Sequence, residues 1–346
     1  MQTAVQQTLD IPLRWTEIIA TNPIPKSELE SAVTNLKNVL VKADRQALKN
    51  QNIVPPRLVA DVEDAFRACN AKLQSDLTNG NEEVGARIQS ELLPYLLLTN
   101  TAERWYSKPR GYAGDFLSIH EIYQNVPQGL GRIGSVLDRC FLNLPAAVAV
   151  RNRRPLLAQE INAVVAAKQG AQARITTLAC GPAAEVFDVY EGLEDKSKLT
   201  STLVDIDLQA LAFVAERRDK ARLQRQMRLL NANLVYVLTG REKIDLRNQD
   251  LIYSIGLIDY FSDDFVIKLL NYIHSTLTTG GKVILGNFHP RNPDKAIMDH
   301  VFDWRLIHRS EADMDRLFKA SAFQSACTNV RFEEQGINLF AECVKQ

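Results

Sequence analysis

The sequence lacks several features that would place it in a specialised class of protein. Its 346 residues include five cysteines, an odd number without a C-x-x-C pair. That pattern argues for reduced thiols in a cytoplasmic protein rather than for disulfides. The chain also lacks a net charge, because 41 lysines and arginines balance 41 aspartates and glutamates. No overall field therefore attracts nucleic acid or an anionic membrane, and we expect neither as a partner.

Signals for export, membrane insertion and metal binding are absent from the sequence as well. The first fifteen residues have neither the basic nor the apolar region of an export signal. The most apolar short run, Leu92–Leu98, is interrupted by Pro94. The spacings H-E-x-x-H and H-x-x-E-H do not occur, so we expect no catalytic metal. The sequence predicts a cytoplasmic protein without a membrane span.

Helical patterning dominates the first part of the chain. Apolar residues recur at helical spacing over Glu28–Lys49, Leu58–Leu77 and Val84–Leu98. Breaks at Asn50–Pro56 and Thr78–Asn81 separate these stretches. No strand-like alternation occurs before about residue 170. We therefore predict an all-helical N-terminal domain.

Apolar runs and helical stretches alternate in the second part of the chain. One long amphipathic stretch, Leu208–Leu230, predicts a helix. The alternation predicts an α/β fold with a mostly parallel, doubly wound sheet, which binds ligands beyond the carboxyl ends of its strands. Since the chain is longer than a usual single domain, we expect a helical domain over residues 1–145 and a Rossmann-like domain over residues 146–346. The expected strands are Ile175–Ala179, Ser201–Val204, Leu234–Leu238, Asp250–Gly256, Lys282–Leu285, Asn329–Phe332 and Leu339–Val344.

The most informative stretch connects the first two expected strands. The first strand ends in a turn around Gly181, and the second ends at Asp205 and Asp207. A glycine lets the backbone approach a ligand, and the following helix presents free N–H groups. Asp205 follows Gly181 by 24 positions, which suits a carboxylate that accepts both hydroxyls of a ribose. Because Ala179 and Ala183 replace glycines of G-x-G-x-x-G, a dinucleotide site is disfavoured, and an ordinary strand-to-helix turn stays an alternative.

Two further stretches carry unusual composition. Residues 104–116 combine aromatics, cations, glycines and a carboxylate between two helical segments. Loops of this composition commonly carry function, although a solvated turn with strain-relieving glycines is the alternative. Residues 150–154 form a cationic run just before the first strand. That run is either a solvated helix face or a partner for a carboxylate.

Four segments together resemble the motifs of class I S-adenosylmethionine (SAM) methyltransferases in order and spacing: Ala179–Glu185, Asp205–Asp207, Asp250–Tyr260 and Gly280–Leu285. In this motif I, Thr177 occupies the usual acidic place. The resemblance implies SAM as cofactor and a Rossmann-like class I methyltransferase sheet.

A narrower resemblance concerns the family for biosynthesis of 3-hydroxypalmitic acid methyl ester, a bacterial extracellular factor. It is carried by KPRGYAGD at 108–115, AVRNRR at 149–154, GLIDY at 256–260 and DWRLIHR at 303–309. The match spans residues 105–344 and leaves out the first hundred residues. Because that family includes members of unassigned substrate, it supports a methyltransferase better than it supports a fatty acid acceptor.

The resemblance implies a role for each motif. Asp205 would accept the ribose hydroxyls, with Asp207 as the competing candidate, and Asn233 would lie beside the adenine. Asp259, Tyr260 and the Arg110–Asp115 loop would close over the sulfonium, whose charge suits aromatic faces and carboxylates. The expected cofactor-binding residues are Ala179, Cys180, Gly181, Asp205, Asp207, Asn233, Ser254, Asp115 and Asp259.

The acceptor determines which further residues are needed. A carboxylate is ionised at neutral pH and needs a positioning cation rather than a base, for which Arg110, Arg151, Arg153 and Arg309 are candidates. A hydroxyl or amine needs a base, which His289 or His308 could supply. The expected catalytic residues are Arg110, Tyr112, Tyr260 and His289.

We expect a small-molecule acceptor, best a fatty or hydroxy-fatty acid that yields a methyl ester. An inactive regulatory protein that binds SAM or an acyl group is the alternative from a different class. A nicotinamide oxidoreductase is a more distant one, because the glycine pattern is wrong. A homodimer is compatible with the sequence.

Overall fold

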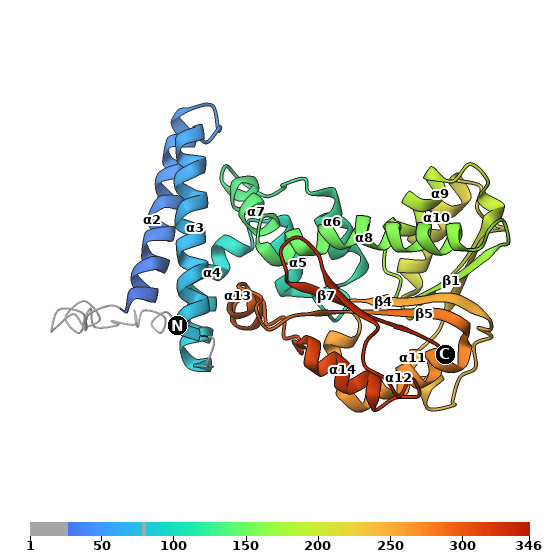
Figure 1. The fold of residues 1–346 in the computed structure, drawn as a ribbon. Helices are drawn as coiled ribbons and strands as arrows, with labels where there is room; N and C mark the ends of the chain where they lie inside the picture. Colours follow the sequence, from blue (N-terminus) through green and yellow to red (C-terminus); the bar gives the residue numbers. More distant parts are fainter. Residues whose placement is uncertain (1–26, 78–80) are drawn as a thin grey trace, which may run out of the picture.

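The computed structural model describes residues 27–77 and 81–346. The N-terminal segment that was searched for an export signal, and most of the predicted break at Thr78–Asn81, lie outside these residues. Figure 1 shows a helical hairpin at one end of the molecule and a sheet covered by helices at the other. Within the described residues, no helix is long and apolar enough to cross a membrane.

The sheet has seven strands in the order β3-β2-β1-β4-β5-β7-β6. Neighbouring strands from β3 to β5 are parallel, whereas β7 runs antiparallel to β5 and β6 antiparallel to β7. The chain reverses its direction of winding between β1 and β4, which is where doubly wound sheets open a crevice. The prediction of a Rossmann-like α/β fold with a helical region is confirmed. The strands are β1 (Ala173–Leu178), β2 (Leu199–Asp205), β3 (Met227–Asn231), β4 (Gln249–Ile255), β5 (Leu277–Phe288), β6 (Asn329–Phe332) and β7 (Asn338–Val344).

Helices cover both faces of the sheet (Figure 1). One face packs against α8 (Pro145–Ala167), α9 (Ala184–Gly192) and α10 (Leu208–Lys220). The other face packs against α11 (Leu234–Leu238), α12 (Asp263–Thr276) and α14 (Glu311–Lys319). Because both faces are covered, most residues of the central strands β1 and β4 are buried, rather than every second one.

The first half of the chain forms the helical layer, as the apolar spacing predicts. Its core also takes in α13 (Lys295–His300) and the buried residues that follow it, up to Leu306. The helical core is thus completed by a segment that leaves the sheet after β5. The division at residue 145 stays a prediction. The helices of this layer are α2 (Glu28–Lys49), α3 (Pro56–Leu77), α4 (Glu82–Leu96), α5 (Asn100–Ser107), α6 (Phe116–Gln124) and α7 (Gly134–Leu142).

One predicted strand is wrong. Leu234–Leu238 forms the short helix α11, capped by the side chain of Asn233, which accepts the N–H of Val235. The third strand is β3, which overlaps the end of the predicted helix Leu208–Leu230; α10 ends at Lys220 instead. The reason is that β3 is an edge strand, so its exposed polar residues hide the apolar alternation of a strand.

A buried carboxylate joins the helical layer to the sheet. Asp294, next to α13, accepts hydrogen bonds from Asn70 Nδ2 of α3 and from the Ala146 N–H of α8, each at 2.7 Å. Its side chain is fully buried. A buried acceptor of this kind connects three helices that are far apart in the sequence.

We expect Asp294→Ala to lower the free energy of unfolding by about 2–4 kcal/mol, because two buried donors lose their acceptor. Urea denaturation followed by circular dichroism measures the effect. The control Asp64→Ala removes a carboxylate on α3 whose side chain is 69% exposed, so a change below about 0.5 kcal/mol is expected. Equal effects of the two substitutions would contradict the docking role of Asp294.

Candidate active site

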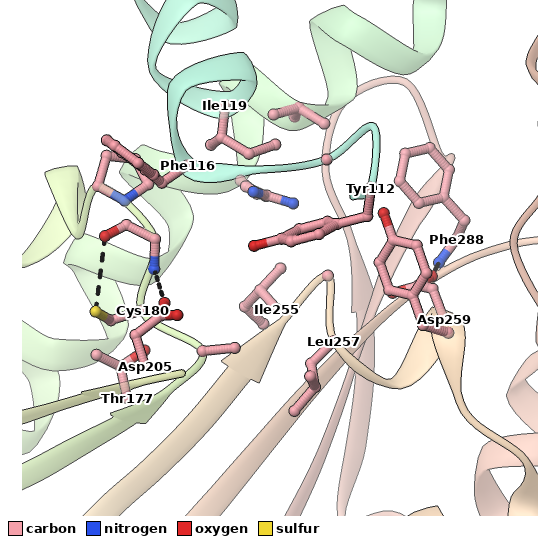
Figure 2. A pocket seen from close by; sticks show the side chains of 18 of the residues that line it. Tyr112, Phe116, Ile119, Thr177, Cys180, Asp205, Ile255, Leu257, Asp259 and Phe288 are labelled. Carbon is pink, nitrogen blue, oxygen red and sulfur yellow. Dashed lines mark hydrogen bonds between the residues drawn. The ribbon is translucent and has the colours of Figure 1, made fainter. Parts of the chain in front are cut away.

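A cavity of about 340 Å³ lies beyond the carboxyl ends of β1, β2 and β4. Figure 2 shows it between the strand ends and the loop that carries Tyr112. The cavity occupies the position where the winding of the sheet reverses, as the fold predicts for a ligand site. Its walls come from the sheet, from α8 and from the segment after β5.

The turn after β1 forms one wall of the cavity. Ala179, Gly181 and Ala183 all have left-handed backbone, with φ of +57°, +52° and +47°. The two alanines therefore keep the conformation that glycine adopts more easily, at a cost of about 1 kcal/mol each. Cys180 lines the cavity too, and burial raises the pKa of its thiol well above the usual value. The turn thus presents backbone, not a reactive thiolate, to a ligand.

Asp205 ends β2 beside this turn. Its Oδ2 accepts the Gly181 N–H and its Oδ1 accepts the Asp207 N–H, both at 2.9 Å. Burial raises the pKa of Asp205, and these backbone N–H groups oppose the increase. Each carboxylate oxygen keeps a further lone pair, and the side chain lines the cavity (Figure 2). Asp205 can therefore accept hydrogen bonds from a diol.

Arg110 and Asp207 do not line the cavity, contrary to prediction. Asp207 accepts the Gln209 N–H at the start of α10 and pairs with the guanidinium of Arg110. Arg110 also donates to the side chain of Gln209. Since both charged groups are used in this pair, they connect the loop after α5 to the segment that follows β2.

Asp115 is likewise placed away from the cavity. Its carboxylate is fully buried, accepts the N–H groups of Leu117 and Ser118, and contacts Arg104 Nη2 at 2.7 and 2.6 Å. With its lone pairs used to start α6, Asp115 shapes the loop and is not available to a cofactor.

Three other predicted residues have structural partners instead of a place at the cavity. Asn233 caps α11, and the hydroxyl of Ser254 donates to the Leu178 carbonyl at 2.7 Å. His289 Nε2 lies 3.0 Å from Glu311, and its Nδ1 accepts from Arg291. All five histidines lie in the described part of the chain, and none of them lines the cavity. The structure therefore offers no histidine base at this site.

Two charged residues at the cavity were missed or left open by sequence reasoning. Glu185, in the first turn of α9, accepts the Tyr253 hydroxyl at 2.7 Å, and burial raises its pKa. Arg153, on α8, is 6% exposed and donates from Nε to the Tyr123 hydroxyl at 3.2 Å. Among the described residues its Nη atoms have no hydrogen-bond partner. A Cβ added at Gly256 would lie 3.3 Å from Nη1 of this arginine.

The end of the cavity near β5 is mostly apolar. Phe288, Trp304 and Leu306 line it. The Tyr260 hydroxyl accepts from Trp304 Nε1 at 2.9 Å, and the rings of Tyr112 and Tyr260 meet edge to face at 6.2 Å. Figure 2 shows Phe288 and Asp259 on the opposite side of the cavity from Asp205 and Cys180. The cavity thus has a polar end at β1 and β2 and an aromatic end at β4 and β5.

Of the predicted site residues, the structure brings together seven at this cavity: Ala179, Cys180, Gly181, Asp205, Tyr112, Tyr260 and Asp259. Their common signal is a place at a strand end or in the loop over it. Within residues 27–77 and 81–346, no group of three or more His, Cys, Asp or Glu side chains is arranged to hold a metal ion.

Solved structures of other proteins are similar to this architecture. The structure is similar to that of a possible exported protein from Bordetella parapertussis, with a TM-score of 0.57, 18% identity, and 91% and 96% of the two chains covered. It is more distantly similar to magnesium protoporphyrin IX methyltransferase (ChlM) from Synechocystis PCC 6803 with bound S-adenosylhomocysteine (SAH). The TM-score is 0.44, the identity is 12%, and 58% of this chain and 87% of the other are covered.

In sequence, the chain is 24% identical over 248 residues to the uncharacterized protein YnbC of Escherichia coli strain K12. The match covers 66% of this chain but only 40% of that relative's length. A family model described as "Putative methyltransferase" matches residues 111–342. This range includes the loop over the cavity and six of the seven strands whole. The chain belongs to this methyltransferase family.

Proposed function

We propose that the protein transfers a methyl group from SAM to a small-molecule acceptor. The observation that carries this proposal is Asp205, a buried carboxylate with free lone pairs at the end of β2, beside the left-handed turn after β1. That arrangement suits a ribose diol next to a closely approaching backbone. When bound, SAM would supply the activated methyl group.

Two buried charged residues that line the cavity match the amino acid part of SAM. Glu185 offers a carboxylate to the ammonium group, and the free Nη atoms of Arg153 suit a carboxylate. Both side chains are buried, so their hydrogen bonds would be strong. The aromatic faces of Tyr112 and Tyr260 suit the positive sulfonium. We assign Arg153 to the cofactor because it lies against Gly256. Gly256 directly follows β4, the strand that neighbours β1.

The best acceptor on this geometry is a carboxylate on an apolar body, which would yield a methyl ester. A carboxylate needs no base, in keeping with a cavity that no histidine lines. The apolar walls suit an acyl chain, and the sequence resembles the 3-hydroxypalmitic acid methyl ester family. Arg151 and Arg309 do not line the cavity, and both donate to backbone carbonyls, so neither of these two arginines is placed to pair with such an acceptor.

Two experiments test the proposal. The first is calorimetry with SAM, and the second is tritium transfer from labelled SAM to straight-chain acids from butanoate to hexadecanoate. Labelled ester supports it. SAM binding without product from acids, alcohols or amines would favour a regulatory protein instead. No binding of SAM would overturn the proposed function altogether.

We expect Asp205→Ala to weaken SAM and SAH binding about tenfold to a hundredfold, because hydrogen bonds to a charged acceptor are lost. Asp250→Ala is the matched control. Asp250 also accepts a backbone N–H, that of Arg174, but it lies at the opposite edge of the sheet. Calorimetry should detect unchanged SAM affinity in the control, whereas a similar loss in both variants would contradict the ribose assignment.

The assignment of Glu185 and Arg153 is tested with 5′-methylthioadenosine, which lacks the amino acid part. We expect Glu185→Gln and Arg153→Gln to weaken SAM binding about tenfold or more and to change 5′-methylthioadenosine binding less than about threefold. The control Glu160→Gln alters a buried glutamate of α8 that pairs with Lys282. Equal losses for both ligands in the Glu185 and Arg153 variants would contradict the assignment.

A further inference from the structure

Asp259 has a carboxylate oxygen without a partner at the aromatic end of the cavity. The residue follows β4 in the turn Ile258–Tyr260 and is 1% exposed. Its Oδ1 accepts the Phe288 N–H at 2.7 Å, whereas Oδ2 has no hydrogen-bond partner among the described residues. A buried polar atom of this kind on a cavity-lining residue is a candidate contact for a ligand, because leaving it unpaired is unfavourable. Figure 2 shows Asp259 beside Phe288, below the loop of Tyr112.

No cation pairs directly with Asp259. Burial raises the pKa of its carboxyl to about 6, although the Phe288 N–H and the more distant charges of Arg309 and Arg153 act to lower that pKa. Arg309 is engaged by the Ile258 and Phe261 carbonyls and by Asp263. The neighbouring phenol of Tyr260 has a raised pKa, chiefly through burial, and stays neutral. The neutral form of Asp259 is therefore accessible near neutral pH.

The hydrogen bond to Phe288 determines where the proton of the neutral form resides. Oδ1 accepts the Phe288 N–H, and in a neutral carboxyl the carbonyl oxygen is a better acceptor than the hydroxyl oxygen. The proton therefore sits on Oδ2, the oxygen that has no protein partner. Asp259 lines the aromatic end of the cavity, and in its neutral form it thus carries an O–H donor that has no partner among the described residues.

We propose that neutral Asp259 donates a hydrogen bond from Oδ2 to the carboxylate of the methyl acceptor and so selects acids as acceptors. This inference rests on the proposed function. The proton is taken up from solvent when the acid binds and stays on Asp259 during the reaction. The acceptor oxygen forms the new bond to the methyl carbon as the carbon–sulfur bond breaks and leaves its electron pair on sulfur. A neutral donor holds the carboxylate while leaving more of its negative charge for attack than a guanidinium fork would.

The test is the binding of decanoate to the SAH complex from about pH 5.5 to about pH 8.5 by calorimetry. Above the pKa of Asp259, each pH unit should weaken binding about tenfold, because one proton must be taken up. Comparing buffers of different ionisation enthalpy counts that proton. In turnover with SAM, the sulfonium charge should move the midpoint of the pH profile of kcat/KM for decanoate to lower pH.

Two substitutions separate the donor from other roles. In Asp259→Asn the amide oxygen can accept the Phe288 N–H and the NH₂ group takes the place of the proton. We expect this variant to bind decanoate within about threefold of the wild type at low pH, with no pH dependence, and to retain turnover. Asp259→Leu should weaken decanoate binding about tenfold or more and leave SAH affinity unchanged. Asp264→Asn, at an exposed residue, should behave as the wild type.

Three results would overturn the inference. Loss of turnover in Asp259→Asn with unchanged decanoate affinity would make Asp259 a base instead. A flat pH profile in the wild type would exclude a titrating donor. Failure of decanoate to bind to a well-formed SAH complex would remove the acid from the site while leaving the proposed use of SAM intact. Failure of SAM and SAH to bind would instead remove the proposed function itself.

Discussion

The hydrogen bond from the Gly181 N–H to Asp205 organises the cavity. It joins the turn after β1 to the last residue of β2, at the level where Leu178 pairs with Val204 in the parallel register. The second oxygen of the same carboxylate holds the Asp207 N–H, just before α10. Because both partners are backbone groups, one side chain sets the shape of two adjacent connections. Its remaining lone pairs stay available at the cavity wall, so the residue that shapes the site can also bind the ligand.

The helical layer closes one side of the cavity, which the strand ends alone would leave open to solvent. Arg104 fixes Asp115 between α5 and α6, and Arg110 ties the same loop to Asp207 at the sheet. The charged residues of KPRGYAGD are thus used in ion pairs within the protein, whereas its Tyr112 and Gly114 line the cavity. A Cβ at Gly114 would lie 2.7 Å from the Tyr260 hydroxyl, so that position requires a glycine for close approach.

The unusual motif I is compensated by its surroundings. Thr177 takes the place of the usual acid, yet Glu185 brings a carboxylate to the same cavity from α9 and is held there by the hydroxyl of Tyr253. Ala179 and Ala183 retain left-handed backbone. The turn after β1 therefore keeps a left-handed backbone without the usual glycines, and a carboxylate still lines the cavity.

What the sequence by itself determined were the features that local pattern controls. Helical periodicity is strong in α2 and α3, and short apolar runs mark the parallel strands, so the fold class and the position of Asp205 at a strand end could be predicted from residue order. Contacts between distant segments were decided by the tertiary structure alone. His289 pairs with Glu311, Asp115 with Arg104, and β3 lies at the edge of the sheet. Such outcomes depend on which charged partner the fold brings within hydrogen-bond reach, and a linear pattern does not carry that information.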